Sequence, residues 1–324
     1  MIAKRGIAIK ILVTGGYGFI GKKLVNVLNQ NKHEVTVLSR RKNTCFFEGV
    51  RIINGDLTSL DCPFDNLLNN CDVVFHCAAE IHNEEIMQEL HVAGTHRLMD
   101  AVLNEARKSK KIIHWVQLSS VGVYGLSLKA ANEKRIVTEK TAKNPKGVYE
   151  VTKALSDDLV IKASRTELVT YTILRPSIVF GVDMPNQSIQ ALGRMIASRR
   201  FFYIGKPDAV ATYIHVDDVV NALLHCGTDS RAKNMIFNIS NDCLQQDMIN
   251  SIANTLNVEN PKIRLPESFV RYIVRILPKF INSPLTCSRI NALVSRTYYS
   301  NSLIKSTLSL SPKIDVSEAI KELF

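Results

Sequence analysis

The chain has 324 residues, of which 46% are hydrophobic, and a formal charge of +11 at pH 7. This is enough apolar material for one large domain or two modest ones, and no run of about 18 apolar residues predicts a membrane span. The seven cysteines form no CxxC pair and the first residues do not resemble a signal peptide. We therefore expect a cytoplasmic protein without a disulfide framework or a metal site, and its dispersed basic residues argue against nucleic acid as a partner.

Short β-branched runs alternate with helical patterns along the first half of the chain. Strands are expected at residues 8–13, 34–38, 50–53, 72–76, 112–118 and 169–174, and helices at 18–29, 84–108 and 147–165. This alternation predicts an α/β fold with a doubly wound parallel sheet. After residue 181 the pattern loosens, with helices expected at 188–198 and 216–226. We therefore expect a dinucleotide-binding domain from 8–180 plus about 207–240, and a smaller, partly helical C-terminal substrate-binding lobe from 181–206 and 241–324.

A glycine-rich turn lies between the first expected strand and the first expected helix. Gly15, Gly18 and Gly21 have the spacing G-x-x-G-x-x-G, and Phe19 and Ile20 stand between the last two. Glycine lets the backbone turn tightly and approach a pyrophosphate, and the helix N-terminus offers free N–H groups to that anion. These five residues therefore predict the dinucleotide-binding turn of a Rossmann fold.

The second expected strand ends in Ser39, Arg40 and Arg41. An acidic residue here would bind the ribose 2′-hydroxyl of NAD, whereas these side chains can bind the 2′-phosphate of NADP. NADP(H) is therefore the predicted cofactor, and NAD, with both arginines in solvent, is the alternative.

Tyr149 and Lys153 stand at positions i and i+4 of an expected helix, so that their side chains share one face. We expect the nearby ammonium and an oxidised nicotinamide to lower the pKa of the phenol, so that Tyr149 can exchange a proton with a carbonyl or hydroxyl oxygen. Ser120 would hold the same oxygen by a hydrogen bond. These three residues are the predicted catalytic group.

Several segments occur in the order of the motifs of one enzyme family. Besides the glycine turn they are Gly55-Asp56-Leu57, His76-Cys77-Ala78-Ala79, Ser119 to Gly125 (S-S-x-x-V-Y-G), Tyr149 to Lys153 (Y-x-x-x-K), Leu174 to Gly181 and Tyr213 to Val219. Together they resemble the extended short-chain dehydrogenases/reductases, the NAD-dependent epimerase/dehydratase family. The resemblance implies that Asp56, Leu57, Ala78, Ala79, Pro176 and Ile178 contact the cofactor. It also implies a homodimer through the helices that follow Glu84 and Gly147.

The chain departs from the family's motifs at several positions. His91 replaces the asparagine of N-x-x-G-T, and Ser120-Val121-Gly122 stands where sugar-nucleotide 4,6-dehydratases carry Thr-Asp-Glu, which argues against dehydration. Ile178 and Ala211 replace the asparagine and arginine with which 4-epimerases help to hold a nucleotide diphosphate. The basic residues that could take over this role are Arg194, Arg264, Arg289 and Arg296.

A net reductase consumes NADPH at every turnover, whereas an epimerase regenerates its cofactor. The predicted function is therefore NADP(H)-dependent reduction of a nucleotide-activated 4-keto-6-deoxy sugar in surface-polysaccharide synthesis, an assignment that rests on similarity to bacterial reductases. The alternatives are a nucleotide-sugar 4-epimerase, a reductase of an apolar sterol-like or flavonoid-like ketone, and a non-catalytic dinucleotide sensor.

Residues 268–281 place Arg271, Arg275 and Lys279 at every fourth position among apolar residues. Such a helix can lie on an anionic membrane. More often it covers the substrate pocket or packs on the core with its basic stripe in water, so membrane contact is not expected.

Overall fold

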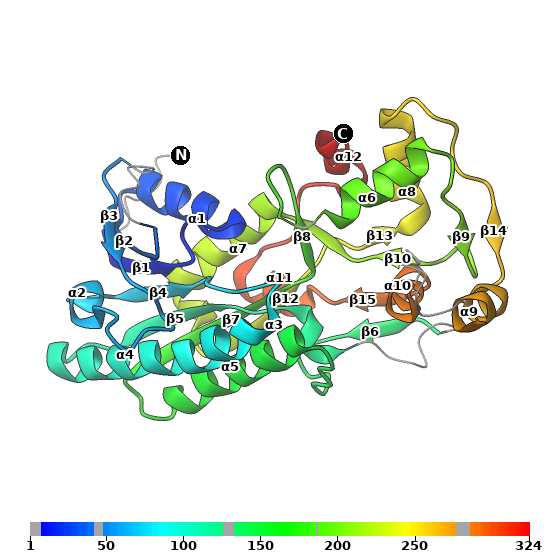
Figure 1. Ribbon diagram of the computed structural model, residues 1–324. Coiled ribbons are helices and arrows are strands. Elements are labelled where there is room, and N and C mark those ends of the chain that lie inside the picture. The colour runs from blue at the N-terminus through cyan, green and yellow to red at the C-terminus, as the bar shows by residue number, and fades with distance from the viewer. Residues whose placement is uncertain (1–7, 42–47, 126–132, 186, 277–285) are drawn as a thin grey trace.

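The central element of the computed structural model is a seven-stranded parallel sheet (Figure 1). The structure describes residues 8–41, 48–125, 133–185, 187–276 and 286–324. In chain order the strands of this sheet are β1 (Lys10–Thr14), β2 (Glu34–Ser39), β3 (Arg51–Asn54), β4 (Val73–His76), β5 (Ile113–Leu118), β7 (Val169–Pro176) and β12 (Met235–Ile239). The predicted α/β class is confirmed. β12, which pairs with β7, is not among the predicted strands.

The strands lie in the order β12-β7-β5-β4-β1-β2-β3. All of them are parallel, but the side on which successive strands are added to the sheet changes between β1 and β4. β1 pairs with both β2 and β4, so the chain runs outward from β1 on one side and from β4 on the other. In open α/β sheets ligands bind outside the carboxyl ends of the strands at such a reversal. The segments that follow Thr14 and His76 therefore begin at the edge where a ligand is expected.

Helices cover both faces of the sheet (Figure 1). One face carries α1 (Phe19–Gln30), α7 (Val216–Thr228) and α11 (Ser302–Leu308), and the other carries α2 (Phe64–Leu68), α4 (Thr95–Ser109) and α5 (Val148–Ser164). Every residue of β4 and β5 is buried. Uninterrupted buried strands are typical of a parallel sheet that is covered on both sides.

The long helix predicted at 84–108 is divided into three parts. They are α3 (Glu84–Gln88), a π-helical turn (Glu89–Gly94) and α4. π-helical turns inside α-helices often occur at functional sites. This turn contains His91, one of the residues at which the chain departs from the family's motifs.

A smaller group of elements packs beside the carboxyl ends of the sheet strands (Figure 1). Its helices are α6 (Ser188–Ala197), α8 (Gln245–Thr255), α9 (Glu267–Ile276), α10 (Cys287–Leu293) and α12 (Val316–Ala319). Its strands form the pairs β9 (Tyr203–Ile204) with β14 (Arg264–Leu265) and β10 (Val210–Ala211) with β13 (Cys243–Leu244). Two further pairs are β6 (Arg135–Val137) with β15 (Thr297–Tyr299) and β8 (Ile178–Phe180) with β11 (Tyr213–His215). The division into two lobes at the predicted boundaries stays a prediction.

Within the described ranges, no helix is both long and apolar enough to cross a bilayer.

Candidate active site

The glycine turn forms a tight cradle after β1. Gly15 has φ +70°, and a Cβ added there would lie 2.7 Å from the backbone of Cys77 and Ala78. A Cβ at Gly21 would lie 2.1 Å from the carbonyl oxygen of Gly15. Larger residues therefore cannot stand at either position without moving the backbone.

The first helix begins directly at this turn. Gly18 is its N-cap and provides no side-chain hydrogen bond, and the first turn contains no acidic residue. The N–H groups of the first turn are therefore available to an anion, and the positive end of the helix dipole favours one. This arrangement fits a dinucleotide pyrophosphate.

The loop after β4 is bound to the same turn. Nδ1 of His76 lies 2.8 Å from Thr14 Oγ1, and the main-chain N–H of Ala78 donates to Thr14 Oγ1 at 3.3 Å. Burial, helped by the charge of Lys153, lowers the pKa of His76 to about 3, so the ring is neutral. Ala78 is half-buried and Ala79 is exposed at this edge of the sheet.

The residues predicted to bind the adenosine half lie at the ends of β2 and β3. Ser39 Oγ accepts from the N–H of Arg41 at 3.0 Å, and the Arg41 guanidinium stands 5.7 Å from the ring centroid of Tyr17 in the glycine turn. Arg40 is exposed. Asp56 Oδ1 accepts from the N–H of Thr58 at 2.9 Å. Leu57 is buried, and its carbonyl accepts from Arg97. Arg41 thus lies against the glycine turn.

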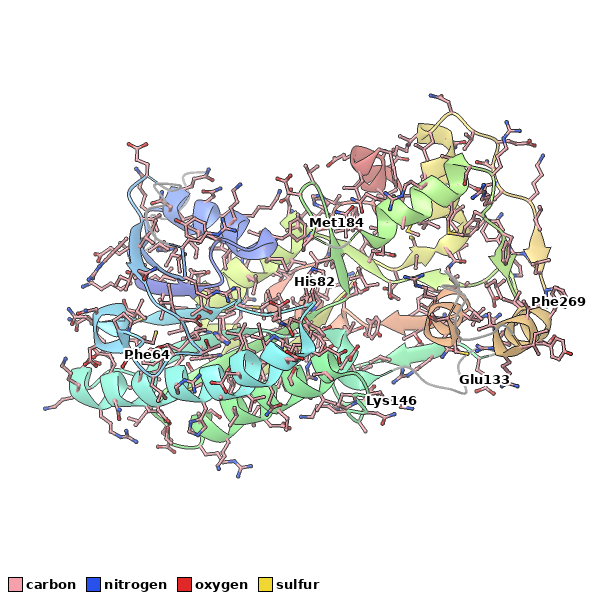
Figure 2. All side chains as sticks on the ribbon, viewed as in Figure 1. Phe64, His82, Glu133, Lys146, Met184 and Phe269 are labelled. Carbon is pink, nitrogen blue, oxygen red and sulfur yellow. The ribbon has the colours of Figure 1, made fainter. Side chains whose placement is uncertain are left out.

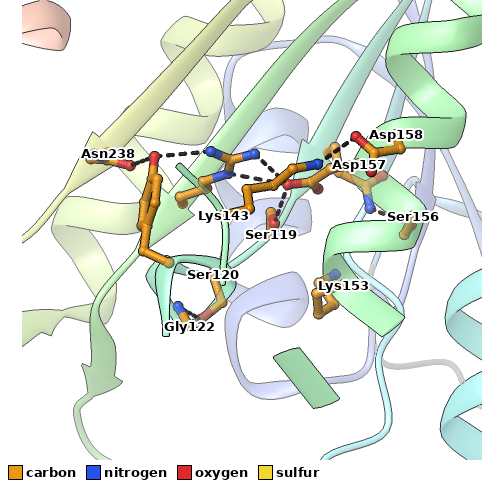
Figure 3. Close-up of polar contacts among 12 residues, drawn as sticks. Ser119, Ser120, Gly122, Lys143, Lys153, Ser156, Asp157, Asp158 and Asn238 are labelled. Carbon is orange, nitrogen blue, oxygen red and sulfur yellow. Dashed lines mark hydrogen bonds and ion pairs between the residues drawn. The ribbon is translucent and has the colours of Figure 1, made fainter. Parts of the chain in front are cut away.

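Ser120 lies just after β5, and Tyr149 and Lys153 lie on α5; Figure 3 shows Ser120 and Lys153. Ser120 follows β5, and its Oγ accepts from the N–H of Gly122 at 3.0 Å, which leaves the hydroxyl proton free to donate elsewhere. Lys153 is 2% exposed, and its ammonium donates to the carbonyl of Leu118 at 2.5 Å. Burial lowers the pKa of Lys153, while the charge of Asp157 and the thiol of Cys77 oppose that change.

Tyr149 stands one turn before Lys153 on α5, as the spacing predicts, but its pKa moves in the other direction. Burial raises the pKa of the phenol to about 12, and the carboxylates of Glu150 and Asp157 act in the same direction. The predicted lowering of this pKa by the ammonium is not found, because burial and the two carboxylates raise it. At neutral pH the phenol therefore keeps its proton.

His91 connects the loop after β4 to the helix that carries Tyr149. The N–H of Glu80 donates to its Nε2 at 2.9 Å, so the ring proton is on Nδ1, which donates to Thr152 Oγ1 at 2.8 Å. The ring of His91 meets the Tyr149 ring edge to face, with centroids 5.7 Å apart. Burial, followed by the charge of Lys153, lowers the pKa of His91 to about 4. His91 is therefore a neutral hydrogen-bonding residue.

A buried ionic network, which the sequence motifs do not indicate, lies behind the catalytic residues (Figure 3). Oδ2 of Asp157 accepts from Arg175 Nη2 at 2.9 Å and from Arg175 Nε at 3.1 Å. It also accepts from Ser119 Oγ at 2.9 Å, and Nη1 of Arg175 donates to Tyr124 Oη at 2.9 Å. Asp157 follows Lys153 by four residues, so this network fixes the turn of α5 next to the lysine.

The other predicted cofactor-binding residues lie where β7 ends. Pro176 is buried at the end of β7, and Ile178, on β8, is 46% exposed and pairs with Tyr213 of β11. An apolar side chain therefore occupies this position at the surface of the site.

A pocket of about 680 Å³ opens in the smaller group of elements. Its lining residues are Gly205, Lys206, Arg264, Leu265, Pro266, Glu267, Ser268, Arg271 and Arg296. The structure thus brings the predicted Arg264 and Arg296 together and adds Lys206 and Arg271. Arg194 and Arg289 are exposed and do not line it. Ser120, Tyr149 and Lys153 do not line it either.

The described residues contain no cluster of three or more His, Cys, Asp or Glu that could hold a metal ion.

Comparison with known proteins gives one family and a consistent fold. A family model described as NAD dependent epimerase/dehydratase family matches residues 11–240. A dTDP-glucose 4,6-dehydratase of Mycolicibacterium smegmatis is 32% identical over 240 residues, which cover 68% of this chain and 69% of that protein. A decarboxylating sterol-4-alpha-carboxylate 3-dehydrogenase of Mus musculus is 26% identical over 96% of this chain and 89% of that protein. The crystal structure of a Thermotoga maritima UDP-glucose 4-epimerase with UDP-glucose superposes with a TM-score of 0.73 at 18% identity, covering 97% of each chain.

Proposed function

Since the chain belongs to the NAD-dependent epimerase/dehydratase family, we propose that it is an NADP(H)-dependent enzyme that reduces the keto group of a nucleotide-activated 4-keto-6-deoxy sugar. The observation that carries this proposal is the convergence of three segments at one edge of the sheet. They are the glycine turn after β1, the His76 loop after β4 and Ser120 after β5, and Lys153 reaches the last of these from α5.

The glycine turn and the N-terminus of α1 would hold the pyrophosphate, and Arg41 the 2′-phosphate of NADP. The bound dinucleotide supplies the hydride. The chain's own residues then have to orient the keto group and deliver a proton to its oxygen.

Tyr149 suits the reductive direction. A phenol with a pKa of about 12 is protonated at neutral pH and can donate to an oxygen that gains negative charge. The hydroxyl of Ser120 can donate to the same oxygen. Lys153, one helical turn away on α5, donates to the carbonyl of Leu118 at the end of β5, the strand that Ser120 follows.

The cations around the 680 Å³ pocket support an anionic substrate. Arg264 stacks on Tyr203 with its guanidinium 4.6 Å from the ring centroid, and its Nη1 donates to the carbonyl of Lys206 at 3.1 Å. Rigidly held arginines of this kind suit a diphosphate. We therefore assign the nucleotide half of the substrate to this pocket and the sugar to the region of Tyr149. The cations of the pocket would then bind the diphosphate in place of the asparagine and arginine of 4-epimerases, which Ile178 and Ala211 replace in this chain.

Four other functions have less support. An apolar ketone, suggested by the sterol dehydrogenase relative, would not need these cations. A non-catalytic sensor would have no use for the retained Tyr149 and Lys153. A 4-epimerase would share the same residues but would not need the phosphate-binding Arg41. Dehydration needs an acid and a base, and Val121 and Gly122 supply neither.

Glu150 supplies one carboxylate near this position. A methyl group at Gly122 would lie 2.8 Å from Glu150 Cγ. One carboxylate alone does not restore the acid–base pair of the dehydratases.

We also propose a homodimer in which α5 contacts its counterpart. Val148, Val151 and Leu155 are 38%, 36% and 42% exposed and follow one another at i, i+3 and i+7 of this helix. An apolar stripe of this kind on an outer helix favours burial against a second copy.

A substrate panel tests the proposed reaction. The purified chain would be incubated with 4-keto and 4-hydroxyl nucleotide sugars and either NADPH or NADH, and oxidation of the reduced cofactor would be followed optically. We expect consumption of NADPH with a 4-keto-6-deoxy sugar. Tightly bound NAD with interconversion of 4-hydroxyl epimers and no net oxidation would establish the epimerase instead, and no reaction with any sugar would refute the sugar assignment.

A further inference from the structure

Helix α9 carries apolar side chains in two directions. Val270 is 4% exposed and packs with Ile290 and Val294 of the neighbouring α10 region. Phe269, Tyr272, Ile273 and Ile276 point elsewhere and are 52%, 61%, 36% and 58% exposed. The helix lies at the outer end of the smaller group of elements, and Phe269 projects from that end (Figure 2).

The exposed apolar residues form one continuous stripe. They stand at i, i+3, i+4 and i+7, the spacing of a single face of an α-helix. Isolated exposed apolar residues are ordinary, whereas four large ones on one face of a ten-residue helix mark an interaction surface.

Positive charge borders the stripe. Arg275 is exposed on the side of the helix away from Val270. Arg271 is held between Glu267 Oε1, with which it forms an ion pair, and Asn291 Oδ1, at 2.8 Å from each, so Arg275 is the arginine of α9 that is exposed. The whole chain carries +11. The surface is therefore amphipathic and basic.

We propose that α9 docks the protein on an anionic lipid bilayer. The helix lies parallel to the membrane plane, with Phe269, Tyr272, Ile273 and Ile276 in the boundary between headgroups and acyl chains, and Arg275 meets the lipid phosphates. A helix with an apolar face and a basic flank binds such a surface without crossing it. The proposal goes beyond the expectation from sequence, in which this helix covers the substrate pocket or packs on the core with its basic stripe in water.

A second copy of the chain fits this surface less well. In a symmetric dimer the same patch meets itself, so two surfaces that each carry the exposed Arg275 would face one another. The neutral apolar stripe of α5 is the better surface for that contact. Anionic lipid complements both the charge and the apolar side chains of α9.

Vesicle binding tests this proposal without any substrate, so its outcome is independent of the proposed reaction. The full-length chain would be sedimented with vesicles of phosphatidylcholine alone or with roughly a third phosphatidylglycerol. We expect the partition coefficient to be at least about tenfold higher on the anionic vesicles and to fall about tenfold or more in the double variant Phe269→Ser/Ile276→Ser. The matched control Leu60→Ser/Ile112→Ser removes two exposed apolar side chains from other regions and should leave binding within about twofold of the native chain.

A fluorescent variant locates the contact. The only tryptophan, Trp115, is 0% exposed, so Tyr272→Trp adds a surface reporter to a constant background. Its emission should shift to shorter wavelength on anionic vesicles. The proposal is overturned if neither vesicle binds the native chain, if the α9 double variant binds as well as the native chain, or if Tyr272→Trp shows no shift. It is also overturned if sedimentation velocity shows a dimer of the native chain and a monomer of the α9 double variant, because a second copy of the chain would then cover this surface.

Discussion

Replacing Arg41 by alanine tests how the chain distinguishes its two possible cofactors. The Arg41 side chain stands over the ring of Tyr17 in the glycine turn, just past the end of β2, where the 2′-phosphate of NADP is expected. The neighbouring Arg40 is also exposed. We therefore expect Arg41→Ala to weaken binding of NADPH and to leave binding of NADH nearly unchanged.

The size of the effect follows from one charge-assisted hydrogen bond. Such a bond to a phosphate contributes about 1.5–3 kcal/mol, which corresponds to roughly 10- to 150-fold in Kd. Arg41 is exposed, so solvent screening places the expected loss near the lower end, at about tenfold. Arg40→Ala, the matched control, should change the Kd for NADPH by less than about threefold.

Fluorescence titration of reduced cofactor into each variant, at one fixed ionic strength, measures these constants. Equal weakening of NADPH and NADH in Arg41→Ala would refute the reasoning, because it would show a general loss of the site and not of phosphate recognition. A larger effect of Arg40→Ala would show that Arg40, and not Arg41, binds the phosphate.

Two further predictions concern the surroundings of the catalytic residues. Asp157→Asn leaves the buried charge of Arg175 without its partner and should lower the free energy of unfolding, measured by denaturant titration, by about 3–5 kcal/mol. The matched control Asp158→Asn removes an exposed ion pair with Lys143 and should lower it by less than about 1 kcal/mol. Similar losses in both variants would contradict the role of the buried network. The second prediction concerns His91, whose pKa is about 4 in the folded chain and 6.5 in the unfolded chain. Because the folded chain disfavours the protonated ring, the contribution of neutral His91 to stability is complete above pH 6.5 and is lost as the pH falls toward 4. Between pH 6.5 and 4 the free energy of unfolding should therefore fall by about 3 kcal/mol more in the native chain than in His91→Asn. If the free energy of unfolding depends on pH in the same way in both proteins, the lowered pKa of His91 is excluded.

Most of the fold could be predicted because the βαβ pattern is local. The predicted strand at 34–38 and helix at 147–165 differ from β2 and α5 by no more than one residue at either end. Strand β12 was missed because its position depends on pairing with β7, about 60 residues earlier in the chain. The π-helical turn at Glu89–Gly94 was missed because helical periodicity continues through it.

The site was predictable where one short segment carries the whole arrangement. The glycine turn and the Tyr149–Lys153 spacing are of this kind. The contact of Asp157 with Arg175 joins α5 to β7, and the pocket gathers cations from β14, α9 and two loops, so neither follows from spacing alone. The direction of the Tyr149 pKa was predicted wrongly because burial, which raises this pKa, cannot be read from an i, i+4 pair.

The central claim is that the phenol of Tyr149 delivers a proton beside a dinucleotide that rests on the glycine turn. Turnover and NADPH affinity of Tyr149→Phe, measured together on a sugar that the native chain reduces, test it most directly. We predict that the Kd for NADPH stays within about threefold while kcat falls by about 100-fold or more. A variant that binds NADPH and keeps more than about a tenth of the native kcat would show that another group supplies the proton.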